Sequence, residues 1–157
     1  IPAHFEVRNG STSELPPDEL FDTVLYIDVL EHIEDDRGEL ERAMGHLVPG
    51  GHVVVVSPAH NYLYTEFDRR IGHFRRYDRK GLLDITPAGS TVATCRYLDS
   101  VGMLASLANK LVLKSGSPNE AQIRLWDGAM VPASRALDKL LRYSLGKSIV
   151  CVYRRPL

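Results

Sequence analysis

Residues 23–30 read Thr-Val-Leu-Tyr-Ile-Asp-Val-Leu, and residues 52–58 read His-Val-Val-Val-Val-Ser-Pro. Each run is apolar on both faces of an extended chain, the first until Asp28 and the second until Ser57. Strands of this composition are typical of parallel sheets that are covered on both sides. The two runs therefore predict two buried parallel strands, and the residues between them decide how these strands are connected.

The segment between the two runs has the periodicity of a helix. Asp36 can cap this helix together with Glu39, three residues later, and Pro49-Gly50-Gly51 is expected to stop it. The apolar residues of the segment recur at helical spacing: Leu40, Ala43, Met44 and Leu47. A strand, a helix and a strand with short links predict the right-handed crossover of an α/β sheet.

The remaining segments extend this pattern without dividing it. No repeat, low-complexity stretch or Gly/Ser linker interrupts the chain, so we expect one α/β domain over residues 1–157. We expect residues 59–80 to form a lid-like loop and residues 101–147 a helical cap insertion; the alternative for the latter is packing on the sheet or on a partner subunit. Strand-like patterns in three further segments bring the expected number of strands to five: residues 4–8, 91–98 and 148–153.

Composition and charge exclude several classes of protein. The chain has 157 residues, 44% of them hydrophobic and 25% charged, which suits one domain with a packed core and excludes disorder. Its apolar runs are too short to span a membrane. The net charge is −1, so we expect no nucleic-acid partner. Two cysteines are too few for a disulfide framework or a cysteine zinc site; since no signal-peptide pattern is present either, we expect a cytoplasmic location.

Polar residues follow each of the two central strands. Ligands of open α/β sheets bind outside the carboxyl ends of the strands, so neighbouring strands would bring these residues to one rim. The residues concerned are Asp28, Glu31, His32 and His60. The alternative is structural: Asp28 and Glu31 cap the following helix, and His32 lies at the surface.

A basic stretch lies within the expected loop. Residues 69–80 contain six Lys or Arg residues and one acidic residue, Asp78, together with Phe74 and Tyr77. Arginine binds phosphate and carboxylate groups through two parallel hydrogen bonds, so the stretch is a candidate clamp for an anionic ligand. One alternative is a solvated loop whose arginines pair with Asp68, Asp78 and Asp84. Basic residues mixed with Phe74 and Tyr77 could also bind RNA, which the near-neutral net charge of the whole chain disfavours.

Two motifs resemble a known family. Residues 21–35 carry F-D-x-V-L-x-x-D-V-L-E-H-I-x-D and residues 47–53 carry L-x-P-G-G-x-V, a pair that resembles the class I S-adenosylmethionine-dependent methyltransferases. Residues 72–77, Gly-His-Phe-Arg-Arg-Tyr, followed by Lys80 and Leu82, resemble a stretch found in a bacterial branch of that family. The resemblance implies a Rossmann-like, mostly parallel sheet with an antiparallel last strand.

The resemblance also implies S-adenosylmethionine as the cofactor. The family's first strand ends in a glycine-rich loop that binds this cofactor, and no Gly-x-Gly pattern occurs here, so we expect the chain to be the later part of a longer domain whose N-terminal strands are missing. Ser11 stands where the family often places an acidic residue near the adenine. The implied cofactor-binding residues are Ser11, Thr12, Asp28, Val29 and Leu30.

Methyl transfer to a small-molecule acceptor is the function that the resemblance implies. The sulfonium is already a strong electrophile, so the protein has mainly to align the acceptor, and a histidine can take the proton of a hydroxyl acceptor. The candidate bases are His32, His60 and His73, and the candidate residues for binding an anionic acceptor are Arg75, Arg76 and Tyr77. The alternative is a non-catalytic binding or assembly domain with the same fold; the oligomeric state is left open.

A metal ion is not expected at this rim, although one alternative includes it. Asp28, Glu31 and His32, with His73 further along the chain, are similar in spacing to the Glu-x-x-Glu-His plus distal His set of small-RNA 2′-O-methyltransferases. Oxygen and nitrogen ligands of this kind would suit Mg²⁺ or Mn²⁺.

Overall fold

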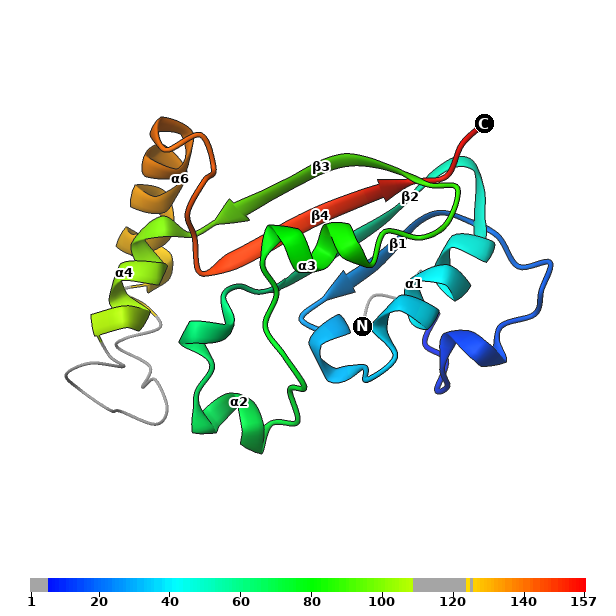
Figure 1. Cartoon of the computed structure of the whole chain (residues 1–157), viewed down its shortest axis with the longest axis horizontal. Coiled ribbons are helices and arrows are strands. Elements are labelled where there is room, and N and C mark those ends of the chain that lie inside the picture. The colour runs from blue at the N-terminus through cyan, green and yellow to red at the C-terminus, as the bar shows by residue number, and fades with distance from the viewer. Residues whose placement is uncertain (1–5, 109–123, 125) are drawn as a thin grey trace.

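A computed structural model of the protein describes residues 6–108, 124 and 126–157 (Figure 1). Short 3₁₀ helices, a π-helical turn, α-helices and strands alternate along these residues. In chain order the elements are η1 (Thr12–Glu14), β1 (Phe21–Ile27), η2 (Leu30–His32), α1 (Asp36–Gly45), β2 (Leu47–Pro58), η3 (Asn61–Leu63), α2 (Glu66–Arg70), α3 (Arg79–Asp84), β3 (Thr91–Leu98), α4 (Ser100–Ala108), η5 (Trp126–Met130), α6 (Val131–Leu140) and β4 (Ser148–Arg154).

The strands of the described residues form one four-stranded sheet in the order β1-β2-β4-β3. β1 pairs with β2 in parallel, whereas β4 pairs antiparallel with both β2 and β3. Three strands therefore run in one direction, and the last strand of the chain runs against them between two of its neighbours. This confirms the mostly parallel α/β sheet with an antiparallel last strand.

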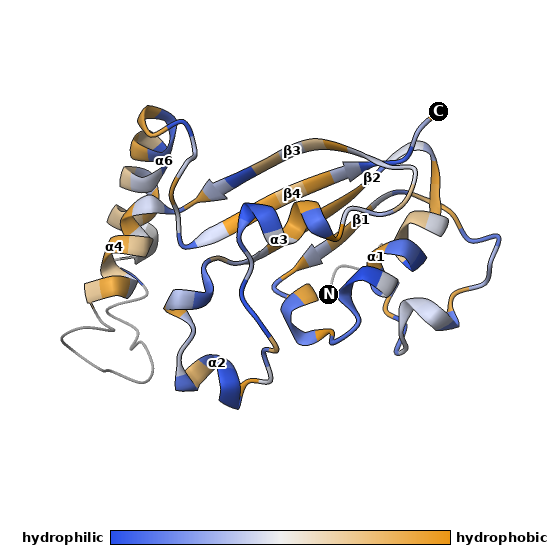
Figure 2. Cartoon of the chain, viewed as in Figure 1, coloured by the Kyte–Doolittle hydropathy of each residue, from blue (hydrophilic) through white to orange (hydrophobic). Residues whose placement is uncertain are grey.

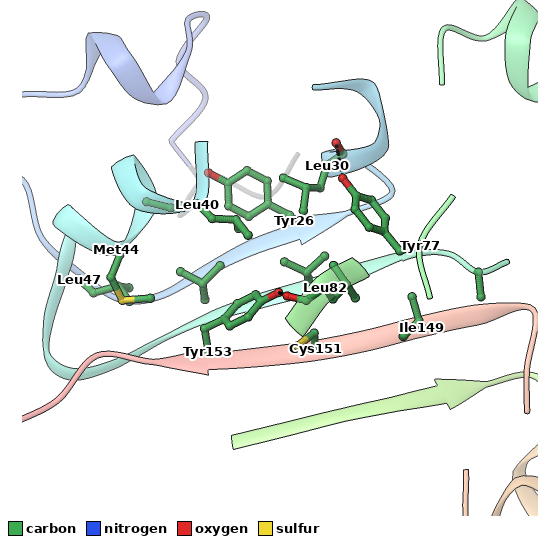
Figure 3. Packing of buried hydrophobic residues seen from close by; sticks show 14 of the residues in the cluster. Tyr26, Leu30, Leu40, Met44, Leu47, Tyr77, Leu82, Ile149, Cys151 and Tyr153 are labelled. Atoms are coloured by element: carbon green, nitrogen blue, oxygen red, sulfur yellow. Dashed lines mark hydrogen bonds between the residues drawn. The ribbon is translucent and has the colours of Figure 1, made fainter. Parts of the chain in front are cut away.

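One face of the sheet carries the core. Alternate residues of β2 and β4 point to this face and are fully buried, as are the residues of α1 and α3 that pack on them. Figure 3 shows the side chains of β4 and the Leu82 side chain of α3 packed together, and the Tyr153 hydroxyl donates a hydrogen bond to the Leu82 carbonyl at 2.7 Å. The core includes Tyr26, Leu40, Met44, Leu47, Val53, Val55, Leu82, Ile149, Cys151 and Tyr153.

The other face of the sheet is less covered by the described residues. Leu25 and Ile27 of β1 are 58% and 56% exposed, and Val54 and Val152, beside Leu25 in register, are half-buried. Figure 2 shows that β1, β2 and β4 are largely hydrophobic, whereas the connection around α2 is largely hydrophilic. The sequence pattern predicts strands that are covered on both faces. The described residues cover one face of the sheet and leave the other partly exposed.

Three sequence expectations about individual elements are wrong. Residues 6–8 are irregular instead of forming a strand, because no neighbouring chain in the described residues pairs with them; residues 4 and 5 lie outside the described residues. The N-cap of α1 is Asp35, whose side chain accepts a hydrogen bond from the Gly38 amide at 3.0 Å, and not Asp36. Pro49-Gly50-Gly51 does not stop α1, which ends at Gly45 before β2 begins.

The Pro-Gly-Gly segment instead lies within β2, opposite a break in register between Phe21 and Thr23 of β1. Gly50 has a φ of +80°, a conformation that glycine adopts without strain, so the strand can bulge there. The motif therefore shapes the start of a strand.

The two expected insertions follow the carboxyl ends of β2 and β3, which run in the same direction and so end at the same edge of the sheet. Residues 59–80 contain η3, α2 and the first two residues of α3, and an isolated bridge between Ala59 and Tyr77 closes the loop at its base. In the region 101–147, α4 and α6 pack against each other beside the end of β3 (Figure 1). Residues 109–123 and 125 of this region lie outside the described residues, so its role as a cap stays a prediction.

Candidate functional site

The carboxyl ends of β1 and β2 form one rim, as the parallel pairing requires. The Asp28 amide donates to the Val56 carbonyl at 2.8 Å and so extends the pairing by one residue. Asp28 and His60 then adopt positive φ angles of 52° and 65°, which turn the chain sharply out of each strand. Positive φ is uncommon for residues with a side chain and is concentrated at functional sites. The rim therefore begins with two constrained turns.

Glu31 is buried beneath this rim, although its charge would favour solvent. Its side chain is fully inaccessible; Oε2 accepts a hydrogen bond from the Ser57 hydroxyl at 2.9 Å, and Oε1 has no hydrogen-bond partner. Tertiary structure thus brings the end of β2 to the segment after β1. A buried carboxylate oxygen without a partner is costly and needs an explanation.

His73 lies against Glu31 from the loop side. Its Nε2 is 3.8 Å from Glu31 Oε1, its Nδ1 is 3.0 Å from Asp68 Oδ1, and its side chain is only 6% exposed. The His32 ring packs edge-on against the His73 ring, with 4.5 Å between centroids. Two of the three candidate bases are therefore in contact.

Asp68 holds the loop together. Its carboxylate accepts hydrogen bonds from the Thr65 amide and hydroxyl, both at 2.8 Å, and from Arg76 Nε and Nη2 at 2.8 and 3.0 Å. Burial would raise the pKa of Asp68, but the hydrogen bonds from Arg76 and Thr65 outweigh it and lower the pKa to about 2. Asp68 is therefore ionised at neutral pH and keeps both Arg76 and His73 in place.

The other members of the expected anion clamp also have internal partners. Arg75 pairs with Asp36 and donates to the Glu34 carbonyl at 2.8 Å, and the buried Tyr77 hydroxyl donates to Asp36 at 2.7 Å. Burial, and the bond to Asp36, raise the pKa of Tyr77. Of the three carboxylates named as alternative partners, Asp68 pairs with an arginine, Asp84 pairs with Lys80, and the Asp78 side chain caps α3. These pairs favour the structural alternative for the basic stretch.

His60 occupies a separate part of the rim. Its ring stacks between those of Tyr62 and Tyr97, at centroid distances of 4.9 and 4.7 Å, and its Nε2 is buried without a hydrogen-bond partner. Burial lowers the pKa of His60, so the imidazole is neutral near pH 7. Lys147, at the start of β4, is another half-buried group here, and burial lowers its pKa in turn.

The expected cofactor residues fall into two groups. Ser11 and Thr12 line a hollow of about 330 Å³ in the turn around η1, and the Thr12 hydroxyl donates to Glu39 of α1 at 2.7 Å. Asp28 and Val29 are exposed at the end of β1, whereas Leu30 is fully buried in the core. Leu30 therefore offers no accessible atom to a ligand in this structure.

Sequence reasoning missed three organising residues: Ser57 as the partner of Glu31, Asp36 as the partner of Arg75 and Tyr77, and Lys147. One signal was available for the loop, because Thr65 and Asp68 have the spacing of a capping box, which the structure shows at the start of α2. No local pattern could place Ser57 beside Glu31, since the contact spans 26 residues.

Comparison with known proteins fits this architecture. Residues 2–55 match the family described as "Methyltransferase domain". The structure is similar, with a TM-score of 0.54 and 15% identity, to a protein from Bacillus halodurans assigned as a methyltransferase, over 94% of this chain and 70% of that one. The chain has the fold of a class I methyltransferase.

Other solved structures that are similar to this chain are named for different activities. The [4+2]-cyclase SpnF matches at a TM-score of 0.56 and 16% identity, over 94% of this chain and 54% of its own. The N-methyltransferase NodS from Bradyrhizobium japonicum, in complex with S-adenosyl-L-homocysteine, matches at 0.50 and 16%, over 96% and 54%. The chain thus spans about half the length of both. No curated protein matches the sequence.

Proposed function

We propose that the protein transfers a methyl group from S-adenosylmethionine to a small-molecule acceptor. The observation that carries the proposal is the match of residues 2–55 to the methyltransferase domain, because it includes β1 and the rim segment from Asp28 to His32. The likeness to the NodS complex supports the choice of cofactor.

A cytoplasmic location is part of the same proposal. No helix of the described residues is long and apolar enough to cross a membrane.

The residues at the rim suit part of such a cofactor. The exposed carboxylate of Asp28 can accept hydrogen bonds from an amine, and the exposed Val29 side chain offers an apolar surface. The Ser11 hydroxyl is already shared between Ser13 and Glu14, at 2.7 and 3.2 Å, so its contribution would require these bonds to be exchanged. When bound, the cofactor supplies an electrophilic methyl group, and the chain has to orient the acceptor and accept its proton.

Three histidines stay candidates for the proton acceptor. A base must be within hydrogen-bond reach of the acceptor and unprotonated at working pH. The lowered pKa of His60 keeps its ring unprotonated at neutral pH. The His32 side chain is exposed, so an acceptor can reach it. An anionic acceptor is the finer part of the proposal: Arg75 and Arg76 would bind it only by sharing their present partners, Asp36 and Asp68.

The experiment separates binding from transfer. Calorimetry on the full-length protein is expected to show S-adenosylmethionine binding. Asp28→Ala should weaken this binding about tenfold, because a hydrogen bond to a charged group is lost. Asp18→Ala is the matched control, since Asp18 is an exposed acidic residue in the loop before β1. Transfer of a labelled methyl group to an acceptor library then tests catalysis. Binding without transfer would favour the alternative, a binding or assembly domain, and no binding would refute the proposal.

A further inference from the structure

We propose that Glu31, His32 and His73 form a binding site for one divalent transition-metal ion. Each residue offers one ligand atom, and the three atoms all lie within 4.8 Å of one another. Asp28 does not belong to this group, so the site differs from the four-residue set that sequence spacing suggests. The inference goes beyond methyl transfer and does not depend on it, because metal affinity is measured without S-adenosylmethionine.

The backbone brings the ligands together and holds them. The Phe74 amide donates to the Glu31 carbonyl at 2.9 Å, which fixes the loop alongside η2, and the His73 amide donates to the Asp68 carbonyl at 2.9 Å. Gly72 precedes His73 with a φ of +85°, a conformation that lets the chain reverse after α2. The two segments are far apart in sequence, so the site exists only in the folded chain.

Glu31 Oε1 is the first indication of a missing cation. This oxygen is buried and has no hydrogen-bond partner, while the other oxygen of the same carboxylate is held by Ser57. The neighbouring nitrogen, Nε2 of His73, is 3.8 Å away, which is too long for a hydrogen bond. A positive charge between these two atoms would satisfy both.

The orientation of His73 is the second indication. Asp68 accepts hydrogen bonds on both carboxylate oxygens, because two arginine nitrogens and the Thr65 amide and hydroxyl donate to them. Nδ1 of His73 therefore carries the proton that faces Asp68, and Nε2 presents its lone pair toward Glu31 Oε1. A carboxylate that fixes one ring nitrogen while the other binds metal is the usual outer partner of a metal-ligating histidine.

The donor set selects the class of ion. Two imidazole nitrogens and one carboxylate oxygen suit Zn²⁺, Co²⁺ or Mn²⁺, whereas Mg²⁺ and Ca²⁺ prefer oxygen ligands alone. Bonds of about 2.0–2.2 Å require the three ligand atoms to approach one another. The exposed His32 side chain can do so by rotation, and its exposure leaves further coordination positions open to water or to an acceptor.

The competing explanation places a proton, not a metal, between the two side chains. His73 would then be an imidazolium held between Asp68 and Glu31, and no metal would bind. The two explanations differ in a quantity that does not involve activity: the affinity of the chelator-treated protein for Zn²⁺ and for Co²⁺.

The test is a metal titration of the chelator-treated full-length protein. Calorimetry with Zn²⁺ is expected to give one ion per chain, and Co²⁺ is expected to give a visible absorption spectrum of a bound ion with nitrogen ligands. His32→Ala is expected to lower the affinity by more than about tenfold, at least the loss that follows removal of an outer partner in known sites. His32 is exposed, so this variant should fold, as far-ultraviolet circular dichroism can verify.

The control is His52→Ala, which removes an imidazole from the middle of β2, opposite Thr23 and away from the rim, and should leave the affinity unchanged. Glu31→Gln keeps an acceptor for Ser57 and should also weaken binding more than tenfold. Failure of Zn²⁺ and Co²⁺ to bind would overturn the proposal in favour of the proton. Equal affinity of the His32→Ala and His52→Ala variants and the unaltered protein would overturn it in favour of adventitious surface binding.

Discussion

The core face of the sheet and the loop of residues 59–78 both bury side chains completely, but different forces hold them. On the sheet, β2 and β4 bury valine, isoleucine and tyrosine against α1 and α3, and the free energy grows with the apolar area removed from water. In the loop, Ala59, Leu63 and Tyr77 are also buried, but the carboxylate of Asp68 is buried as well and is paired with Arg76. Small substitutions in the sheet should therefore lower the free energy of unfolding gradually. In the loop, loss of one partner of the buried ion pair should lower it by a large amount in a single step.

The largest expected effect concerns the loop. Arg76→Ala removes the guanidinium that binds Asp68 through two nitrogens and leaves a buried carboxylate without its counter-charge. Loss of one partner of a buried ion pair typically costs about 3–5 kcal/mol of unfolding free energy. Urea denaturation of the full-length protein measures this.

Arg70→Ala is the matched control for that substitution. Arg70 lies in the same basic stretch, but its side chain is 75% exposed and its partner Glu66 is 3.7 Å away, so we expect a loss below about 1 kcal/mol. Similar losses for both arginines would mean that Asp68 does not organise the loop.

A smaller effect separates the two faces of the sheet at neighbouring residues. Val55 is fully buried on the core face, and Val54 is half-buried on the other. Val55→Ala is expected to cost about 2–3 kcal/mol, through lost burial and the cavity that remains, and Val54→Ala less than about 1 kcal/mol. Denaturation midpoints of the two variants test the contrast, and equal costs would show that the second face is covered as well as the first.

The smallest of the three effects depends on pH. Because the pKa of Asp68 is lowered to about 2 in the folded protein, its stabilising contribution is complete above its ordinary pKa of 3.8 and is lost as the pH falls through about 2. The size of the pKa change corresponds to about 2 kcal/mol. Between pH 4 and pH 2, the unaltered protein should therefore lose about 2 kcal/mol more than Asp68→Asn, whereas the cost of Val55→Ala should stay constant. Parallel pH profiles of the unaltered protein and Asp68→Asn would contradict this.

The expectations from sequence succeeded where the information is local. The apolar runs predict β1 and β2, and helical spacing predicts α1, because periodicity depends only on neighbouring residues. They failed at element boundaries: Asp35 and Asp36 are both acceptable caps, and only the fold decides that Asp35 caps α1 while Asp36 binds Arg75 and Tyr77.

For the candidate site, sequence identified residue types and the rim but not the contacts. Asp28, Glu31 and His60 were placed at the ends of two strands by a rule about parallel sheets, and these strands do pair in parallel. The approach of His73 to Glu31, and the separate position of His60 between two tyrosines, depend on how the loop folds back. No spacing along the chain contains that information.

The sequence by itself therefore determined the class of fold, the parallel pairing of β1 with β2 and the edge of the sheet at which chemistry can occur, because hydrophobic periodicity and the order of helices and strands along the chain are local properties. Only the tertiary structure decided which charged groups are partners. Arg75 and Arg76 are as suited to an external anion as to Asp36 and Asp68, and burial of those carboxylates makes the internal pairs preferred. The same burial leaves one oxygen of Glu31 facing two histidines.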